Sequence, residues 1–148
     1  MAKDDKTNVM RLLEQAQIPC TAYFFDPDGE LPDEECSFKT LVTEDGKGGH
    51  YVFVIPVQCT LDLKKAAKTA GVKSIAMIKQ KELLPLTGYV HGGCSPLGMK
   101  KPFPTFLDEI ALISERFCCS AGRRGAQVEV DAEALAALIG AEFADVTE

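Results

Sequence analysis

Apolar residues recur at helical spacing in four parts of the chain, and these parts predict four helices. In the first, apolar positions at i, i+3, i+4 and i+7 from Val9 share one face, with Thr7 as N-cap and Pro19 as the stop. The other three helices are expected at residues 60–71, with Thr60 as N-cap and Gly71 after the last turn, in the short segment KQKELLP that Pro85 ends, and from Asp131 onward.

Runs rich in β-branched and aromatic residues lie between these helices and predict strands. The runs are TAYFF (21–25), KTLVT (39–43), HYVFVIP (50–56), the buried candidate SIAMI (74–78), TFLD (105–108), RFCCS (116–120) and QVEV (127–130), with a short apolar segment at 110–113 and FADV near the end. DPDG is a turn signal, and EDGKGG makes the second and third runs a hairpin with a longer loop. Helices mixed with hairpin-joined strands predict an α+β fold with a mostly antiparallel or mixed sheet.

Length and composition limit the classes of protein to consider. The chain has 148 residues, of which 46% are hydrophobic and 26% charged, so we expect one domain over residues 1–148. No apolar run approaches the roughly 18 residues of a membrane span, and the opening MAKDDKTNVM is too polar for a secretory signal. The six cysteines are scattered without a C-x-x-C pair. We therefore expect a cytoplasmic protein with reduced structural thiols, no membrane partner and no metal or cofactor.

Charge is distributed unevenly along the chain, although the formal net charge is −6. Residues 62–101 carry eight lysines and two acids, whereas residues 26–45 carry eight acids and one base, Lys39. Such asymmetry is compatible with a phosphate-bearing partner on one face, while the acidic remainder limits indiscriminate nucleic-acid binding, so DNA is not an expected partner. The alternative is that these lysines are only the solvated faces of helices.

The segment TGYVHGGCSPLG at residues 87–98 is the strongest candidate for a functional loop. His91 precedes Cys94 by three residues, but two glycines separate them, so a Cys-His nucleophile pair competes with an incidental histidine beside a packing cysteine. Phosphate-loop, dinucleotide-binding, zinc-protease and EF-hand patterns are missing from the sequence. Paired glycines allow close approach to the main chain, so we interpret the loop as recognising a ligand through backbone groups, or as a tight turn without a ligand.

Several segments resemble the YbaK/EbsC family, free-standing aminoacyl-tRNA deacylases related to the editing domain of bacterial prolyl-tRNA synthetase. The matching pieces are KTLV at Lys39, LDLKKAAKTAG at 61–71, TGYVHGGCSPLGMKK at 87–101, PT followed by apolar residues and Asp108, GRRG at 122–125, and the closing EFADV. They occur in family order over nearly the whole chain. The loop fits the family's G-x-x-x-P signature as Gly92 to Pro96, and the long loop with LDLKK is most similar to the Cys-tRNA(Pro) deacylases.

The resemblance implies a mixed, strongly bent sheet flanked by helices, and hydrolysis of the ester between a wrong amino acid and the terminal adenosine of tRNA. In the Cys-specific branch the substrate's own thiol attacks the ester carbonyl, which agrees with the absence of a catalytic triad. Well-aligned intramolecular attack supplies about 7–11 kcal/mol of barrier lowering. The implied partners are mischarged tRNA, at its acceptor end, and prolyl-tRNA synthetase.

The family's functional positions carry over to this sequence as implied roles. Lys39 anchors the acceptor end as a flexible point charge, and Gly92 holds the aminoacyl group through backbone atoms; these two are the catalytic candidates. The substrate-binding candidates are Thr40, Gly93, Cys94, Ser95 and Pro96. The candidates for contacts with the tRNA backbone are Lys64, Lys65, Lys68, Lys100, Lys101, Arg123 and Arg124.

Two positions depart from the family pattern. Cys94 stands where relatives have an aliphatic residue, and Gln127 stands where relatives can carry an acid. Both bear on amino-acid preference, so two rivals to a Cys-tRNA(Pro) deacylase stay open. One is a deacylase of Ala-tRNA(Pro) or another small aminoacyl-tRNA that uses water. The other is a non-catalytic module that binds tRNA or prolyl-tRNA synthetase.

Overall fold

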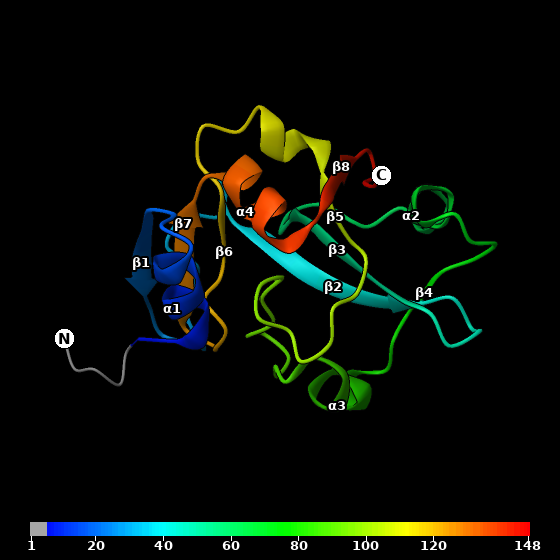
Figure 1. The fold of residues 1–148 in the computed structure, drawn as a ribbon, viewed down its shortest axis with the longest axis horizontal. Helices are drawn as coiled ribbons and strands as arrows, with labels where there is room; N and C mark the ends of the chain where they lie inside the picture. Colours follow the sequence, from blue (N-terminus) through cyan, green and yellow to red (C-terminus); the bar gives the residue numbers. More distant parts are fainter. Residues whose placement is uncertain (1–5) are drawn as a thin grey trace.

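Two β-sheets organise the chain in the computed structural model, which describes residues 6–148 (Figure 1). The smaller sheet is antiparallel, in the order β1 (Cys20–Phe24), β7 (Ala126–Val130), β6 (Cys118–Ser120). The larger has the order β4 (Ala76–Met77), β2 (Phe38–Glu44), β3 (His50–Pro56), β5 (Thr105–Asp108), β8 (Glu142–Ala144). Its pairs are antiparallel from β4 to β3 and parallel from β3 to β8, which confirms the predicted α+β fold with a mixed sheet.

The two sheets meet where β2 begins. Ser37 forms an isolated parallel bridge with Cys118, and the Cys118 N–H donates to the Cys36 carbonyl oxygen at 2.9 Å. The strongly bent sheet expected from the resemblance is therefore a pair of sheets that share this junction. The predicted hairpin is confirmed, since β2 and β3 pair over their full length and the Asp45 N–H donates to the Gly49 carbonyl oxygen at 3.1 Å in the connecting loop.

Two of the predicted helix starts are confirmed by their caps. The Thr7 side chain accepts a hydrogen bond from the Met10 N–H at the start of α1 (Asn8–Gln15), and the Asp131 side chain accepts one from Ala134 N–H at the start of α4 (Ala132–Ile139). The predicted cap Thr60 is wrong, because Asp62 caps α2 (Leu63–Ala70). The Asp62 carboxylate accepts hydrogen bonds from the Lys64 and Lys65 N–H groups at 3.0 Å. The Thr60 carbonyl oxygen accepts a hydrogen bond from the Glu148 N–H.

Pro85 does not end the helix predicted around it. The 3₁₀ turn η2 (Gln80–Glu82) leads into α3 (Leu83–Thr87), and Pro85 is the third residue of α3. In a first turn the backbone N–H groups have no partner within the helix, so proline is tolerated there. Gly88 ends the helix instead, with a left-handed φ of 83°.

Two predicted strands are shorter than expected. Within residues 74–78 only Ala76 and Met77 pair with β2, and both are exposed because β4 lies at the sheet edge, so the expectation of a buried strand is wrong. Within residues 116–120 only the last three form β6. The apolar segment at 110–113 lies mostly in a 3₁₀ helix, η3 (Glu109–Leu112).

No helix in the described part of the chain is long and apolar enough to cross a membrane.

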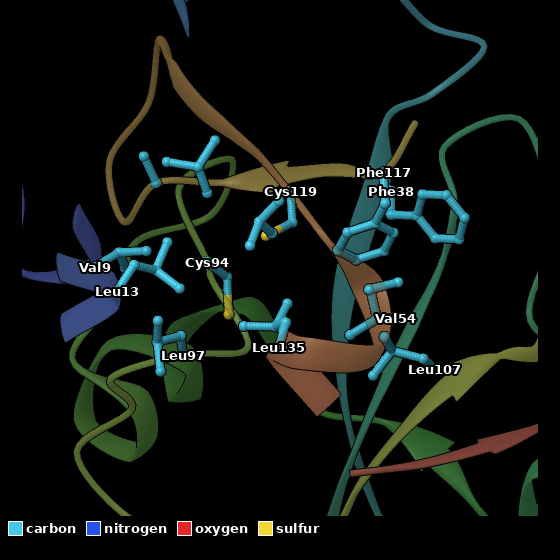
Figure 2. Close-up of a cluster of buried hydrophobic side chains, with 14 of the residues drawn as sticks. Val9, Leu13, Phe38, Val54, Cys94, Leu97, Leu107, Phe117, Cys119 and Leu135 are labelled. Carbon is cyan, nitrogen blue, oxygen red and sulfur yellow. The ribbon is translucent and has the colours of Figure 1, made fainter. Parts of the chain in front are cut away.

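The hydrophobic core has two parts. The larger part lies between α1, α4 and both sheets and includes residues of the loop after α3 (Figure 2). The smaller part lies under α2, around Phe53, Ile55 and Val146. In the view of Figure 1, α4 and α3 lie on either side of β2, with the loop after α3 extending toward β6 and β7. This arrangement brings the loop at residues 88–100 beside the start of β2.

Candidate active site

A cavity of about 410 Å³ lies between the start of β2, the segment from β4 to α3, the loop after α3, and strands β6 and β7. Its size falls within the range of about 300–1,000 Å³ that is usual for small-ligand sites. Most of the lining side chains are apolar, and they include Phe38, Val42 and Ile78. The polar groups are few: the lining residues with polar side chains are Lys39, Thr40, Gln80, His91, Cys94, Ser120 and Gln127.

Lys39 and Thr40 are consecutive residues of β2, and both line the cavity. Within residues 6–148, the Lys39 ammonium is not held by an ion pair or a side-chain hydrogen bond, so its charge is available to a ligand. The Thr40 hydroxyl oxygen is buried and has no hydrogen-bond partner among the described residues. A buried unsatisfied hydroxyl costs about 1–3 kcal/mol, which a bound polar group would recover.

The paired glycines have different roles in the geometry. Gly92 is exposed, lines the cavity and has a left-handed φ of 86°. Gly93 is buried, and a β-carbon added there would lie 2.9 Å from the Arg123 carbonyl carbon and the Arg124 nitrogen. Gly92 therefore presents its main chain to the cavity, whereas Gly93 allows the loop to pack on the turn at 122–125.

Cys94 points into the protein core, although it also lines the inner end of the cavity. Figure 2 shows its side chain close to those of Leu97 and Leu135. Burial raises the pKa of the Cys94 thiol to about 12, and a hydrogen bond with Thr87 opposes this shift only in part. The thiol is neutral near pH 7, so it is not an activated nucleophile, and among residues 6–148 no hydrogen bond joins it to His91.

Ser95 and Pro96 are buried and do not line the cavity. The Ser95 hydroxyl accepts a hydrogen bond from the Leu97 N–H at 3.3 Å, and the Leu97 carbonyl accepts one from the Tyr89 hydroxyl at 2.5 Å. These contacts hold the loop in shape from within. Of the five substrate-binding candidates, Thr40 and Cys94 reach the cavity, whereas Gly93, Ser95 and Pro96 form its support.

The cationic candidates are not gathered in one place. None of the α2 lysines lines the cavity, and the Lys65 ammonium donates to the Asp145 carboxylate at 3.1 Å, which raises the pKa of Lys65. Arg124 donates to the Asp28 carboxylate at 2.7 Å, and the Arg123 guanidinium lies 5.3 Å from the centre of the Phe24 ring. The remaining four cationic candidates, all exposed, are Lys64, Lys68, Lys100 and Lys101.

Three further polar residues line the cavity: His91, which the sequence offers as part of a Cys-His pair, Gln127, which it marks as a departure from the family pattern, and Ser120, which it does not assign to the site. Gln127 is buried, and its amide donates to the Ser37 hydroxyl at 3.0 Å; that hydroxyl donates to the Asp33 carbonyl at 2.6 Å. No sequence signal indicates Ser120, because this residue and Gln127 come to the cavity wall through the pairing of β6 with β7. In the described part of the chain no cluster of side chains could hold a metal ion.

Comparisons with known proteins identify the family of the chain. Residues 30–138 match the model of the aminoacyl-tRNA editing domain. The chain therefore belongs to the aminoacyl-tRNA editing domain family, and its class of enzyme is aminoacyl-tRNA deacylase.

One curated relative and two solved structures are similar over most of their length. The chain is 44% identical to the protein named "Putative Cys-tRNA(Pro)/Cys-tRNA(Cys) deacylase EbsC" of Enterococcus faecalis, over 96% of this chain and 93% of that one. A structure described as "a putative trans-editing enzyme for prolyl tRNA synthetase" is 26% identical, with a TM-score of 0.81, over 95% of this chain and 94% of the other. A hypothetical protein at 24% identity, with a TM-score of 0.84 over 95% and 99% of the two chains, shares the fold.

Proposed function

We propose that this protein removes a mischarged amino acid, cysteine above all, from tRNA(Pro) by using the thiol of the substrate itself. The observation that carries this proposal is a cavity with a cationic side chain and an exposed glycine main chain, but without an activated protein nucleophile. Cys94 is the only cysteine among the lining residues, and burial raises its pKa to about 12. The similarity to a protein named as a Cys-tRNA deacylase supports the same substrate.

The chemistry divides between the two molecules. The substrate thiolate attacks its own ester carbonyl, the carbon–sulfur bond forms, and the ester bond to the ribose breaks; the ribose oxygen takes up a proton and the released thioester is hydrolysed by water. The protein positions the reacting groups, which is the larger part of the acceleration for an ester that is already activated. Lys39 binds phosphate or ribose oxygens of the terminal adenosine, and the main chain at Gly92 holds the aminoacyl group.

Thr40 completes this arrangement. Its buried hydroxyl is without a partner in residues 6–148 and lies beside Lys39 on the same strand, so it donates to or accepts from the bound aminoacyl group. Substrate binding then supplies the hydrogen bond that the free protein lacks. Lys100 and Lys101, exposed and just past the loop, meet the phosphates of the acceptor stem without reading its sequence. The site works on tRNA in the cytoplasm, beside the prolyl-tRNA synthetase that makes the error.

The direct test measures hydrolysis of tRNA(Pro) charged with cysteine, serine, alanine or proline by the purified protein. A serine hydroxyl is far less ionised than a thiol, whose pKa is about 8.5, so we expect Cys-tRNA(Pro) to be cleaved much faster than Ser-tRNA(Pro). Equal rates on these two substrates would rule out thiol-assisted cleavage. Failure to cleave any of the four would contradict the assignment to this tRNA.

A second candidate function is a deacylase of Ala-tRNA(Pro) or another small aminoacyl-tRNA that uses water as nucleophile. One observation favours it: His91 lines the cavity next to Gly92, and imidazole is a suitable base for activating water near neutral pH. His91→Gln separates the two mechanisms, since it would lower hydrolysis of Ala-tRNA(Pro) about 100-fold under the second and leave Cys-tRNA(Pro) cleavage within a few-fold under the first. His50→Gln is the matched control, because His50 packs on Phe103 outside the cavity.

A further inference from the structure

The Cys36 and Cys118 sulfur atoms lie 3.2 Å apart at the junction of the two sheets. Both thiols are free and buried, with 6% and 1% of their surface exposed. A covalent sulfur–sulfur bond is about 2.05 Å long, so a shift of little more than 1 Å would join them. We propose that Cys36 and Cys118 form a reversible disulfide on exposure to a peroxide, and that this bond links the two sheets beside the cavity.

The backbone already holds the two residues in the relation that a disulfide needs. The Cys118 N–H donates to the Cys36 carbonyl at 2.9 Å, and Ser37, the next residue along, bridges Cys118. This hydrogen bond and this bridge fix the backbone of Cys36, in the turn before β2, against that of Cys118 in β6, so only the side chains have to move. The adjacent residues Cys118 and Cys119 are not arranged in this way, because they are consecutive in β6 and their side chains face different neighbours.

The surroundings make Cys36 the thiol that is oxidised first. The Cys36 thiol donates to the Asp33 carbonyl oxygen, with the sulfur 3.6 Å from that oxygen, and Cys36 is 6% exposed against 1% for Cys118. Peroxide therefore reaches the Cys36 sulfur before the Cys118 sulfur, and the thiolate is the form of a cysteine that attacks it. Burial and the contact with Cys36 raise the pKa of Cys118, so Cys118 keeps its proton until the second step.

The reaction balances with hydrogen peroxide as the oxidant. The Cys36 thiolate attacks one peroxide oxygen, the oxygen–oxygen bond breaks, and hydroxide leaves with a proton from solvent as water. Cys118 then attacks the sulfur of the Cys36 sulfenic acid, the sulfur–sulfur bond forms, and a second water leaves. Two thiols give up two electrons in total, which reduce one peroxide to two waters.

The bond affects the cavity wall and the stability of the fold. Cys36 precedes Ser37, whose hydroxyl holds the Gln127 amide in the wall, and it lies three residues before Lys39. The two cysteines are 82 positions apart, so the link closes a long loop and restricts the unfolded chain strongly. We expect oxidation to raise the melting temperature by about 5 °C or more.

The test treats the wild-type protein with excess hydrogen peroxide, blocks the remaining thiols with an alkylating reagent, and maps peptides by mass spectrometry without reduction. The expected result is a Cys36–Cys118 cross-linked peptide, a rise in melting temperature, and reversal of both by dithiothreitol. Cys36→Ser and Cys118→Ser should each abolish the cross-link and the rise. Cys59→Ser is the matched control, since this half-exposed thiol should not affect either result.

Two results would overturn the proposal. One is that wild-type protein keeps all six thiols alkylatable after peroxide treatment. The other is that its cross-link joins a different pair, such as Cys20 and Cys119. A serine variant that fails to fold does not decide the matter, because the wild-type peptide map and its reversal by dithiothreitol give the answer without any substitution.

Discussion

Gly93 lies directly against the main chain of Arg123, at a distance that leaves no room for a β-carbon. This contact joins the loop after α3 to the turn between β6 and β7, and the cavity lies between these two segments. We expect Gly93→Ala to push the loop away from the turn, because both sides of the contact are backbone, and to destabilise the protein by about 1–3 kcal/mol. Thermal unfolding measures the loss, and an unchanged melting temperature would show that the contact is not needed.

Gly92→Ala should affect catalysis more than stability. A β-carbon at Gly92 would meet only the Arg124 side chain, at 3.4 Å or more, but the φ of 86° strains any other residue and the methyl group would narrow the cavity. We expect hydrolysis of Cys-tRNA(Pro) to fall at least 10-fold while tRNA binding changes little. Gly46→Ala is the matched control, since Gly46 has a φ of 77° with open space around it and is not among the residues that line the cavity. Equal losses of activity in both variants would contradict a role for the Gly92 main chain.

Lys39 should be the side chain on which substrate positioning depends most. We expect Lys39→Ala to reduce hydrolysis about 100-fold, because Lys39 is the one lysine or arginine among the described residues that line the cavity. Lys39→Arg should restore only part of the rate, since a planar guanidinium does not replace a compact ammonium. Lys64→Ala, an exposed lysine on α2 outside the cavity, serves as the control in the same hydrolysis assay. Wild-type turnover by Lys39→Ala would remove Lys39 from the site.

Thr40→Val should make the protein more stable and less active. The substitution removes a buried hydroxyl that has no partner in the described structure, so unfolding should require about 1 kcal/mol more. Thr43→Val on the same strand should have the opposite effect on stability, because the Thr43 hydroxyl donates to the Tyr51 carbonyl at 2.8 Å. Denaturant unfolding and Cys-tRNA(Pro) hydrolysis are measured for both variants. A destabilised or fully active Thr40→Val would contradict the proposed role of this hydroxyl.

Cys94→Ala should retain most of the activity, since the attacking thiol belongs to the substrate. It also tests the effect of burial on ionisation. The pKa of Cys94 is raised to about 12, so below the unfolded-state value near 8.5 the neutral thiol is retained in both states. Above that value the unfolded chain loses its proton first, and stability falls with rising pH. The fall in unfolding free energy above pH 9 should therefore be shallower in Cys94→Ala than in wild type.

One result in the hydrolysis assay would contradict the prediction that Cys94→Ala stays active. Loss of hydrolysis by a variant that still folds and still binds tRNA would make Cys94 the nucleophile after all. Ser95→Ala is the companion variant, because Ser95 is buried and its hydroxyl accepts a hydrogen bond from the Leu97 N–H. Activity in both single variants would show that neither neighbouring residue of the loop attacks the ester.

Local signals in the sequence predicted much of the fold. Thr7 and Asp131 cap their helices as expected, because a cap depends on residues only two or three positions away. The prediction that Pro85 ends a helix is wrong because the effect of a proline depends on its position in the helix. The 3₁₀ turn η2 ends at Glu82, so α3 begins at Leu83 and Pro85 lies in its first turn. The edge position of β4 could not be predicted either, since burial of a short strand depends on which neighbours the sheet provides.

The candidate site was predictable only in part. Lys39 and Gly92 were found through motifs, but their common cavity depends on contacts between segments more than fifty positions apart. The hydrogen bond from Gln127 to Ser37 spans 90 positions, and pairing of β7 with β6 places it. The sequence also does not indicate which face of the loop Cys94 occupies, and burial of that side chain decides between a nucleophile and a packing residue.

The last strand of the chain has a consequence for synthesis on the ribosome. β8 pairs in parallel with β5, and the Val146 N–H donates to the Asp108 carboxylate at 3.1 Å. β1 likewise pairs with β7, which lies more than a hundred positions later in the sequence. Neither sheet can be completed until its latest strand, β7 in one sheet and β8 in the other, has left the exit tunnel, so completion of both sheets depends on slow, long-range pairing. Until then the apolar strands β2 and β3 form a hairpin with an exposed edge, which is the stage at which the nascent chain most needs a chaperone.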